Sequence, residues 1–375
     1  MIKIDQIDTS NKADVRRFID FPFSLYKGHE LWVPPIRMDV ATRMNPAKHP
    51  FYEHSHAEFF LAVSDGQDAG RIAAMENRPY NLYHDKRQAQ FYYLECLEDL
   101  EVARALFQHA FEWAQERGLS QMVGPKGFGP LDGYGMLVDG FEHRPAMTMM
   151  NYNPPYLPQF MGELGFQKEV DFASCYLSAE KFRLPERVHR IAERAARRSG
   201  LAIKRFRNKR ELLKWAPKIG RTYNDTFILN WEYYPLTDRE IKYVTDEILT
   251  IADPRLIKII THGDDVVGFL FGFADVSAAI QRSKGRLFPF GILDILIEMK
   301  RTKWIALNGA GVLPEFQGRG GNALLYSEME KTIRESGFHH ADLTQVAESA
   351  VQMRRDLENV GGIAYKTHRV YIRDI

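Results

Sequence analysis

The sequence has few cysteines and almost no excess charge of either sign. Its 375 residues include only two cysteines, Cys96 and Cys175, with no Cys-x-x-Cys pair or Cys/His cluster, which argues against a structural zinc site and against a disulfide-stapled secreted fold. Lysine and arginine total 50 against 49 aspartates and glutamates, a formal net charge of +1. That balance argues against a general nucleic-acid binder. We predict no metal site and no specific nucleic-acid partner.

Long apolar runs are also missing. The N-terminal segment is charged and contains no apolar stretch of secretory length. The longest apolar stretch, Phe288 to Met299, is interrupted by Asp294 and Glu298 and is shorter than the ~20 residues that a membrane span requires. We therefore expect a cytoplasmic protein with no membrane-integral segment. Its length fits about two domains of roughly 150 residues each.

Two landmarks recur at nearly the same spacing and suggest an internal duplication. Gly70 follows the turn of a predicted hairpin and Gly268 follows the turn of a second one, at an offset of 268 − 70 = 198 residues. A helix that stops at Gly165 before a strand recurs at Gly361, where the offset is 361 − 165 = 196. Hairpins and glycine-ended helices are common, so chance is the alternative. The shared offset favours duplication.

Each half alternates hairpin, helix and strand, which predicts an α+β fold of the α/β-sandwich kind. We expect two domains, each with a central mixed, mostly antiparallel sheet flanked by helices. The first domain is predicted at 1–180, a basic linker or helix at 181–210, and the second domain at 211–375. Arginines recur at helical spacing in the basic stretch, which favours a solvated helix face; a nucleic-acid patch is the sharper alternative.

Patterning gives the order of elements in the second domain. We expect helices at 211–230, 237–251, 322–336 and 349–360, and strands at 302–313, 340–346 and 364–372. Between the hairpin and the motif strand lies an amphipathic insertion at 285–303, with apolar residues Leu287, Phe288, Phe290, Ile292, Leu293, Leu296 and Ile297. Packing on the other domain is favoured for it, and a dimer contact, a cover for an acyl chain or a membrane surface are the alternatives.

One segment has the pattern of a ligand-binding site: Val312-Leu-Pro-Glu-Phe-Gln-Gly-Arg-Gly-Gly-Asn-Ala-Leu-Leu325. It reads as a strand end, a sharp turn, a glycine-rich run and an immediate helix. Glycines let successive backbone N–H groups face one concavity, and the helix start adds unpaired donors and a positive dipole end. This predicts a pyrophosphate-sized anion site. The run lacks the Lys-Ser/Thr of a Walker A loop and the spacing of a Rossmann turn, and a glycine-rich turn without a ligand is the alternative.

The same segment resembles the acyl-CoA-binding motif Q/R-x-x-G-x-G/A of the GNAT superfamily of N-acyltransferases, and the element order over 211–375 is similar to that fold. The whole chain resembles tandem bacterial GNAT proteins with a degenerate N-terminal copy. At the matching place the first half has Glu98, Asp99 and Glu101, which would repel a pyrophosphate. The first domain is therefore expected to shape the acceptor site rather than to bind CoA.

The resemblance implies acetyl-CoA or another acyl-CoA as co-substrate. It implies these CoA-binding residues: Gly311, Val312, Leu313, Gln317, Gly318, Arg319, Gly320, Gly321 and Asn322. A backbone amide near Gly311 or Val312 would polarise the thioester carbonyl. Gly309 and Gly311 suit a bulge at the point where the cofactor enters. The variant Gly320→Asp is expected to abolish CoA binding without unfolding the protein.

The chain also departs from the family pattern. Asn322 stands where Gly or Ala is usual, Ala350 stands where an Asn is frequent, and Leu357 stands where the family has a general-acid tyrosine. The motif strand carries no carboxylate. Acid–base chemistry then needs another group, and the candidates are Glu315, Tyr326, Glu348 and Tyr365. Without one of them, the reaction would depend on a water molecule for proton transfer and on holding the two substrates close together.

Two segments are candidates for the acceptor site. Trp231 and Tyr233 lie where the early helices of the superfamily line that site, although aromatic core packing gives the same pattern. Asp132 and Tyr134 lie in the glycine-rich stretch 124–141, which predicts a loop facing a cleft or, equally, a long connection.

The sequence therefore predicts an acyl-CoA-dependent N-acyltransferase, in the first instance an N-acetyltransferase, in which an amine of a small molecule or peptide attacks the thioester directly. A non-catalytic acyl-CoA-binding sensor or partner-binding module is the chief alternative. An aminoacyl-tRNA-dependent transferase ranks last, because it needs the basic stretch 183–210 to hold RNA. A homodimer is left open.

Overall fold

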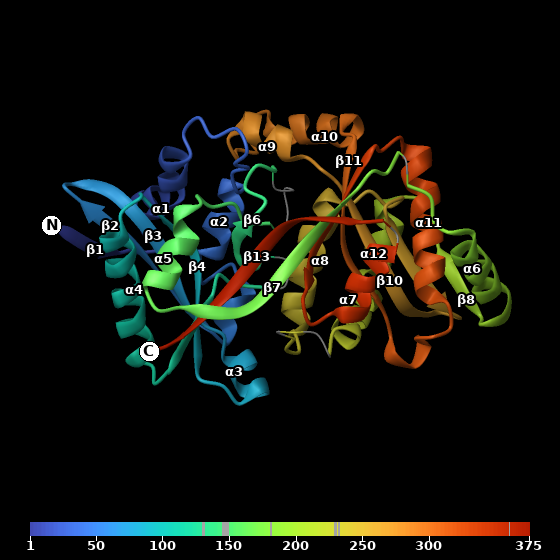
Figure 1. The fold of residues 1–375 in the computed structure, drawn as a ribbon, viewed down its shortest axis with the longest axis horizontal. Coiled ribbons are helices and arrows are strands. Elements are labelled where there is room, and N and C mark those ends of the chain that lie inside the picture. Colours follow the sequence, from blue (N-terminus) through green and yellow to red (C-terminus); the bar gives the residue numbers. More distant parts are fainter. Residues whose placement is uncertain (130–131, 145–149, 181, 229–230, 232, 360) are drawn as a thin grey trace. The chain divides into compact units, whose positions relative to one another are not determined.

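The computed structural model describes residues 1–129, 132–144, 150–180, 182–228, 231, 233–359 and 361–375. They divide into two units that alternate along the chain. Unit 1 comprises Met1–Ala173, Val276–Glu298 and Tyr365–Ile375, and unit 2 comprises Ser174–Asp275 and Met299–Ala364. Strand β7 (Gln167–Leu177) begins in unit 1 and ends in unit 2 (Figure 1).

Unit 1 is built on a sheet with the strand order β1-β2-β3-β4-β5-β13, and β6 also pairs with β13. The strands are β1 (Ile2–Gln6), β2 (His56–Ser64), β3 (Gln67–Glu76), β4 (Gln88–Cys96), β5 (Gln121–Gly124), β6 (Met136–Asp139) and β13 (Ile363–Asp374). The helices are α1 (Lys12–Leu25), α2 (Arg37–Arg43), α3 (Arg78–His84), α4 (Leu100–Gln115), α5 (Tyr156–Glu163), α9 (Ser277–Ser283) and most of α10 (Gly291–Arg301), with a 3-10 turn at Pro50–Glu53.

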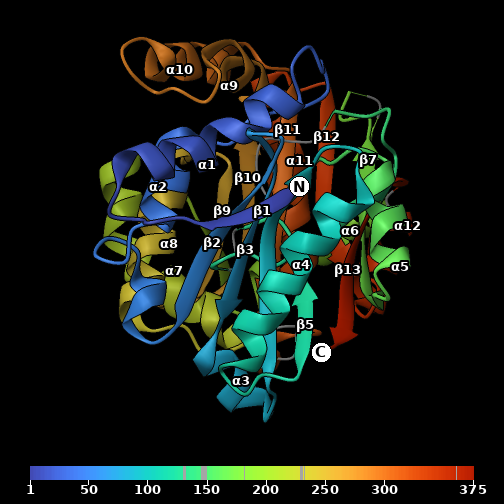
Figure 2. The same cartoon turned by 90° about the vertical axis from the view of Figure 1, so that its left-hand side faces the viewer.

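Helix α4 lies across the strands of unit 1 (Figure 2). Its residues Leu106, Phe107 and Ala110 are spaced at three and four positions, so they share one face of the helix. That face is fully buried against Ile72 of β3 and Phe91 of β4. The core of unit 1 therefore sits between α4 and the sheet.

Unit 2 repeats this plan with the strand order β12-β11-β10-β9-β8. Its strands are β8 (Leu201–Lys204), β9 (Ile257–His262), β10 (Asp265–Ala274), β11 (Trp304–Val312) and β12 (His340–Ala347). Its helices are α6 (Glu186–Arg198), α7 (Lys209–Thr226), α8 (Asp238–Ile251), α11 (Gly321–Ser336) and α12 (Val351–Asn359), with a 3-10 turn, η2, at Pro314–Phe316. No helix of the described residues is long and apolar enough to cross a membrane.

The two units share more than an element order. In each, an antiparallel hairpin leads to a strand that pairs in parallel with the next one: β4 with β5, and β11 with β12. Gly70 lies opposite Cys96 at the end of β4, and Gly268 lies opposite Val312 at the end of β11. A side chain at Gly70 would lie 2.8 Å from Cys96 Cβ, and one at Gly268 would lie 3.0 Å from the carbonyl oxygen of Gly311. Both glycines are thus required by close contact at equivalent places, which supports the duplication.

The chain order does not follow the units. The predicted second domain, residues 211–375, is continuous, whereas the structure places the C-terminal segment Tyr365–Ile375 in unit 1. There, Tyr371–Asp374 of β13 pairs with β5. The insertion Val276–Glu298 belongs to unit 1 as well. The strand pattern of 364–372 predicts a strand but not its partner, and the exact limits of the two duplicated domains stay a prediction.

The basic stretch 181–210 contributes to unit 2. Helix α6 within it buries Ala192 and Ala195, and β8 pairs with β9 at the edge of the sheet. The arginines of α6, namely Arg187, Arg190, Arg194, Arg197 and Arg198, are exposed. Their exposure agrees with a solvated helix face, and the nucleic-acid alternative is not tested by it. Residue 181 lies outside the described residues.

The helices predicted at 211–230 and 237–251 are present as α7 and α8, and residues 229–230 lie outside the described part of the chain. Helix α8 begins with a capping box. The Thr237 hydroxyl accepts from the Glu240 amide at 3.2 Å, and the Glu240 carboxylate accepts from the Thr237 amide at 2.8 Å. We expect Thr237→Ala to lower the free energy of unfolding by about 1 kcal/mol, since one orphan amide loses its partner. Thr237→Ser keeps the hydroxyl and should unfold near the wild-type urea midpoint; equal midpoints for the Ala and Ser variants would contradict the cap.

Candidate functional site

The motif strand β11 separates from β12 halfway along its length. In the described structure the parallel pairing runs from Trp304↔His340 to Leu307↔Leu343 and ends there. On the other side, a register shift leaves Asn308 and Gly309 opposite a single residue of β10. Gly309 has a φ of 79°, in the left-handed region. The predicted bulge is confirmed, and beyond it β11 offers the free strand edge that an extended, amide-containing ligand pairs with.

The residues after the bulge lie against α7 and the aromatic side chains of β10. A Cβ on Gly311 would lie 2.1 Å from Thr226 Cγ2, and one on Gly309 would lie 3.5 Å from Phe271. Phe269 stacks on Phe271 with ring centroids 4.7 Å apart. Glycine is therefore required at 311 because α7 comes so close to the strand.

Thr226 is a residue that the sequence did not single out. Its hydroxyl oxygen is buried and has no hydrogen-bond partner among the described residues. A buried hydroxyl without a partner is rare in folded proteins and calls for a ligand or water. It lies beside Gly311, near the amide predicted to polarise the thioester. No pattern in the sequence marks Thr226, because only the approach of α7 to β11 brings it there.

The glycine-rich run links β11 to α11. Gln317 donates from its side chain to the Val312 carbonyl at 3.1 Å, which closes the turn. Gly318 and Gly320 have φ values of 72° and 87°. Gly320 is the N-cap of α11, and no side chain caps that helix. The first amides of α11 therefore keep the unmet donors and the dipole end that suit an anion.

In unit 1 the corresponding helix start, that of α4, is capped by a side chain of the protein. Asp99 is the N-cap of α4, and its carboxylate accepts from the Glu101 amide at 2.9 Å. A carboxylate therefore takes one of the amides that a phosphate would need at this helix start, and its negative charge disfavours a second anion there. That the first half does not bind CoA stays a prediction.

The structure leaves less space for a side chain at Gly320 than the sequence indicates. A side chain at this position would lie 2.9 Å from Ala195 Cβ and 3.1 Å from Ile191 Cγ2 of α6. Gly320→Asp would then disturb the packing of α6 as well as the loop, which is at odds with the expectation of an intact fold. Gly318 has no atom within 4 Å of its Cβ position. It is the better position for introducing a charge.

The four candidates for acid–base chemistry lie in different surroundings. Glu315 is exposed on η2, and Glu348 is half-buried directly after β12. Tyr365 belongs to unit 1, where its hydroxyl accepts from Lys366 Nζ at 3.2 Å. Tyr326 lies on α11 in unit 2. Unit 2 thus contains Glu315, Tyr326 and Glu348 together with the loop.

Tyr326 is directed at α12, the helix on which the resemblance predicts a general-acid tyrosine. Its hydroxyl lies 3.7 Å from the Met353 sulfur of α12. Met353 and Leu357 are one turn apart, so they share a face of α12, and Leu357 is buried. Burial raises the pKa of Tyr326 to about 12. The phenol therefore stays protonated at neutral pH.

The acceptor candidates of unit 1 have structural partners. The Asp132 carboxylate accepts from the amides of Phe128 at 2.7 Å and Gly129 at 3.1 Å, and it lies 2.9 Å from Arg43 Nε. Tyr134 stacks on Phe172 at 5.4 Å, and burial raises its pKa. These contacts shape the stretch 124–141, of which 130–131 lie outside the described residues. An acceptor role for both residues stays a prediction.

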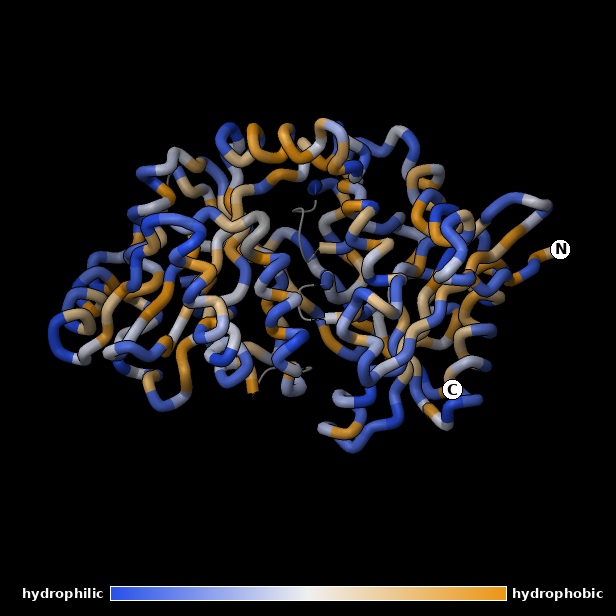
Figure 3. The backbone as a smooth tube through the Cα atoms, turned by 180° about the vertical axis from the view of Figure 1, so that it is seen from behind, coloured by the Kyte–Doolittle hydropathy of each residue, from blue (hydrophilic) through white to orange (hydrophobic). Residues whose placement is uncertain are grey.

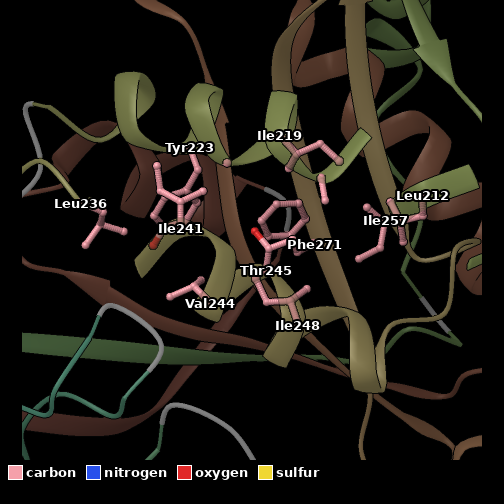
Figure 4. A pocket seen from close by; sticks show the side chains of 12 residues that line it. Leu212, Ile219, Tyr223, Leu236, Ile241, Val244, Thr245, Ile248, Ile257 and Phe271 are labelled. Atoms are coloured by element: carbon pink, nitrogen blue, oxygen red, sulfur yellow. The ribbon is translucent and has the colours of Figure 1, made fainter. Parts of the chain in front are cut away.

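The acceptor candidates of unit 2, Trp231 and Tyr233, are half-buried, while residue 232 between them lies outside the described part. Leu236 of the same segment lines an apolar pocket between α7 and α8 (Figure 4). The pocket is lined by Leu212, Ala216, Ile219, Gly220, Tyr223, Leu236, Ile241, Val244, Thr245, Ile248, Ile257 and Phe271. Only the Thr245 and Tyr223 side chains among them carry a polar atom.

This pocket adjoins the bulge of β11. Phe271 lines it and also lies next to Gly309. Tyr223, another lining residue, stacks on Phe269 with ring centroids 5.7 Å apart. A row of aromatic side chains on one face of the sheet therefore connects the pocket with the free strand edge, and the row provides an apolar surface between them.

No protein-family model matches the chain. It is 28% identical over 375 residues to a protein named bacterial ceramide synthase from Caulobacter vibrioides (strain NA1000 / CB15N), covering 97% of this chain and 96% of that protein. It is 25% identical over 376 residues to Protein YghO of Escherichia coli (strain K12), covering 97% of this chain and 94% of that one.

Among solved structures, a tandem GNAT protein from the clavulanic acid biosynthesis pathway is similar over 100% of this chain and 98% of its own, with a TM-score of 0.58 and 12% identity. At this identity the likeness concerns the fold. The parallel strand pairing that recurs in both units, and the separation of β11 from β12, agree with this likeness. The chain therefore has the GNAT fold in its tandem form.

Proposed function

We propose that the protein is an acyl-CoA-dependent N-acyltransferase that acts on a long-chain amine, and that unit 2 is the copy that binds CoA. The observation that carries the proposal is the pairing of an uncapped, glycine-rich helix start at Gly320–Gly321 with a free strand edge directly before it. The first feature suits a diphosphate and the second suits an amide-containing chain. Pantetheine linked to a diphosphate has both.

Residues of unit 2 divide the binding work. The backbone amides from Gly318 to Asn322 would hold the pyrophosphate, and the exposed Arg319 adds a positive charge beside them. The free edge of β11 would pair with the pantetheine amides. The amide near Gly311 or Val312, together with the Thr226 hydroxyl, would donate to the thioester oxygen as negative charge develops on it.

The chemistry is direct attack of the amine on the thioester carbon. The new C–N bond forms and the C–S bond breaks. Glu348, half-buried at the end of β12, is the carboxylate we propose to take the proton from the amine. Tyr326 would give a proton to the leaving thiolate. Proton transfers of this kind contribute about 10²- to 10⁴-fold to the rate.

The apolar pocket supports a long alkyl chain as part of the substrate. It is lined almost wholly by carbon and reaches the bulge through Phe271. An acetyl group and a small polar amine would make little use of so apolar a lining. A ceramide is the amide of a fatty acid with a sphingoid base, so the name of the Caulobacter relative fits the same substrate class. We propose a sphingoid-type base as acceptor, with its chain in the pocket, and a longer acyl-CoA than acetyl-CoA as donor.

The test combines calorimetry with a thiol-release assay on the full chain. Titration with CoA, acetyl-CoA and palmitoyl-CoA measures binding, and sphinganine, dodecylamine and ethanolamine serve as acceptors in the assay. We expect thiol release with palmitoyl-CoA and sphinganine, and at least about tenfold less with ethanolamine, since each buried CH₂ contributes about 0.8 kcal/mol. Binding without release for any amine would favour a sensor, and absence of binding would leave only the fold.

Filling the pocket should change chain-length preference. Val244 is half-buried and lines the pocket from α8, so Val244→Phe places a ring where the alkyl chain would lie. We expect kcat/KM with sphinganine to fall about tenfold while the value with a short amine such as butylamine stays within twofold. Leu213→Phe is the matched control, because Leu213 is 47% exposed on the outer face of α7. Equal losses for both amines would contradict the assignment.

A further inference from the structure

In the inserted helix α10 the acidic residues face the protein and the apolar residues face outward. This is the reverse of an ordinary surface helix. Its two acidic residues point to α9: Arg282 lies 2.7 Å from Asp294 and 2.5 Å from Glu298. Only Gly291 and Ile295 are buried. A surface helix normally buries its apolar stripe and exposes its charges, so this arrangement needs a separate explanation.

The outward side of α10 is almost wholly apolar. Leu293 is 55% exposed and Leu296 is 49% exposed, and they share one face of the helix with Ile292 and Ile297. Phe288 and Phe290, just before the helix, are 68% and 73% exposed. The helix appears as a mainly hydrophobic coil in Figure 3. Six large exposed apolar side chains within ten residues form a patch of a kind that monomeric proteins rarely leave in water.

Helix α9 and residues 284–285, to which α10 is tied through Arg282, are anchored by other residues of unit 1. The Arg37 side chain donates to the Lys284 carbonyl at 3.1 Å, and its amide donates to the Gly285 carbonyl at 3.0 Å. On α9, the Gln281 side chain donates to the carbonyls of Glu30 at 2.8 Å and Trp32 at 2.9 Å. These partners belong to the segment before α2 and to Arg37, the first residue of α2. The outward face is therefore a fixed feature of unit 1 and not an unfolded end.

Basic residues flank the apolar face. Lys284 and Arg286 precede it and Lys300 and Arg301 end it; all four are exposed, and no ion pair is present for any of them among the described residues. The acidic residues that would offset them are already paired with Arg282. An apolar face bordered by unpaired cations is the pattern of helices that lie in the headgroup region of anionic bilayers.

We propose that α10 with Phe288 and Phe290 is a docking surface for an anionic lipid bilayer, with its apolar side chains among the acyl chains and its basic residues at the headgroups. The charge pattern favours a bilayer over a second copy of this chain. In a two-fold dimer the same patch meets itself, so the four cations of one face would lie against those of the other. This surface goes beyond the proposed chemistry, since it binds a membrane and not a single substrate.

The test is sedimentation of the full chain with sucrose-loaded vesicles, in one series of phosphatidylcholine mixed with phosphatidylglycerol and in another of phosphatidylcholine alone. We expect stronger binding to the anionic vesicles and a loss of at least tenfold for the double variant Leu293→Glu/Leu296→Glu. Lys300→Gln/Arg301→Gln should weaken anionic binding by about 25-fold, because each basic residue contributes roughly fivefold near such a surface. No acyl-CoA or amine is present, so the result is independent of catalysis.

The matched control is Leu82→Glu/Leu97→Glu. These leucines are 87% and 46% exposed elsewhere in unit 1, and the double change adds the same charge. The control should bind vesicles like the wild type. Two results overturn the proposal: wild-type protein that stays in the supernatant with anionic vesicles, or equal losses in the test and control variants. A concentration-dependent dimer that the Leu293→Glu/Leu296→Glu variant dissociates, without vesicle binding, would assign the face to self-association instead.

Discussion

Gly318→Asp should bind CoA about 100-fold more weakly than Gly318→Asn. The two side chains have nearly the same shape, and both Asn and Asp tolerate the left-handed backbone that Gly318 adopts with its φ of 72°. No atom lies within 4 Å of the Cβ position, so neither change disturbs the packing. The difference is one negative charge beside the bound diphosphate. Unit charges about 4 Å apart near a protein surface repel by up to about 4 kcal/mol, which salt reduces.

The measurement is calorimetric titration of both variants with CoA at two salt concentrations. A difference that shrinks at high salt identifies the charge as its cause. Thermal unfolding should be nearly equal for the two variants, which separates loss of the site from loss of the fold. If Gly318→Asp binds as well as Gly318→Asn does, the diphosphate does not lie at this loop and the proposed CoA site is wrong.

Local sequence patterns predicted the parts of the site that depend on local geometry. The glycines and proline after Val312 predict a turn into a helix, and α11 begins at Gly321. Gly309 and Gly311 predict a bulge, and the register of β10 and β11 shifts there. Such features follow from backbone conformations that few residues other than glycine adopt. The hairpins were predictable for the same reason.

Contacts between distant segments could not be predicted in this way. The C-terminal strand β13 pairs with β5 of unit 1, although nothing in its alternation of residues names a partner. Thr226 is an ordinary helical threonine until α7 approaches Gly311. Similarly, the pattern of 285–303 predicts an amphipathic segment whose apolar residues pack, but in the structure those residues are exposed and Arg282 pairs with the acidic residues. Each of these depends on which surfaces meet, and that is a tertiary property.

The resemblance noted in the sequence predicts a general-acid tyrosine on α12 at the position of Leu357. On that alignment, a proton donor for the thiolate is missing from that helix. The Tyr326 hydroxyl reaches Met353 on the same face of α12 from the neighbouring helix α11. One helix would therefore supply the group that the other has lost. This is the reason for choosing Tyr326 over Glu315, whose side chain is exposed on η2.

Tyr326→Phe is expected to lower kcat by about 100-fold at neutral pH while leaving the affinity for CoA within about twofold, because the change removes only a proton donor. The pH profile gives the sharper test. With its pKa raised to about 12, Tyr326 stays protonated through the assay range. The wild-type rate should therefore not fall through ionisation of Tyr326 up to pH 10. A thiol has an ordinary pKa near 8.5, and above that value the leaving thiolate no longer needs a proton. The deficit of Tyr326→Phe should therefore shrink as the pH rises.

Tyr176→Phe removes a phenol hydroxyl that bonds His340 at 2.8 Å in the same unit, and it should leave kcat nearly unchanged. A deficit that is constant with pH, or equal in both variants, would indicate a packing role for Tyr326 and leave thiolate protonation to water.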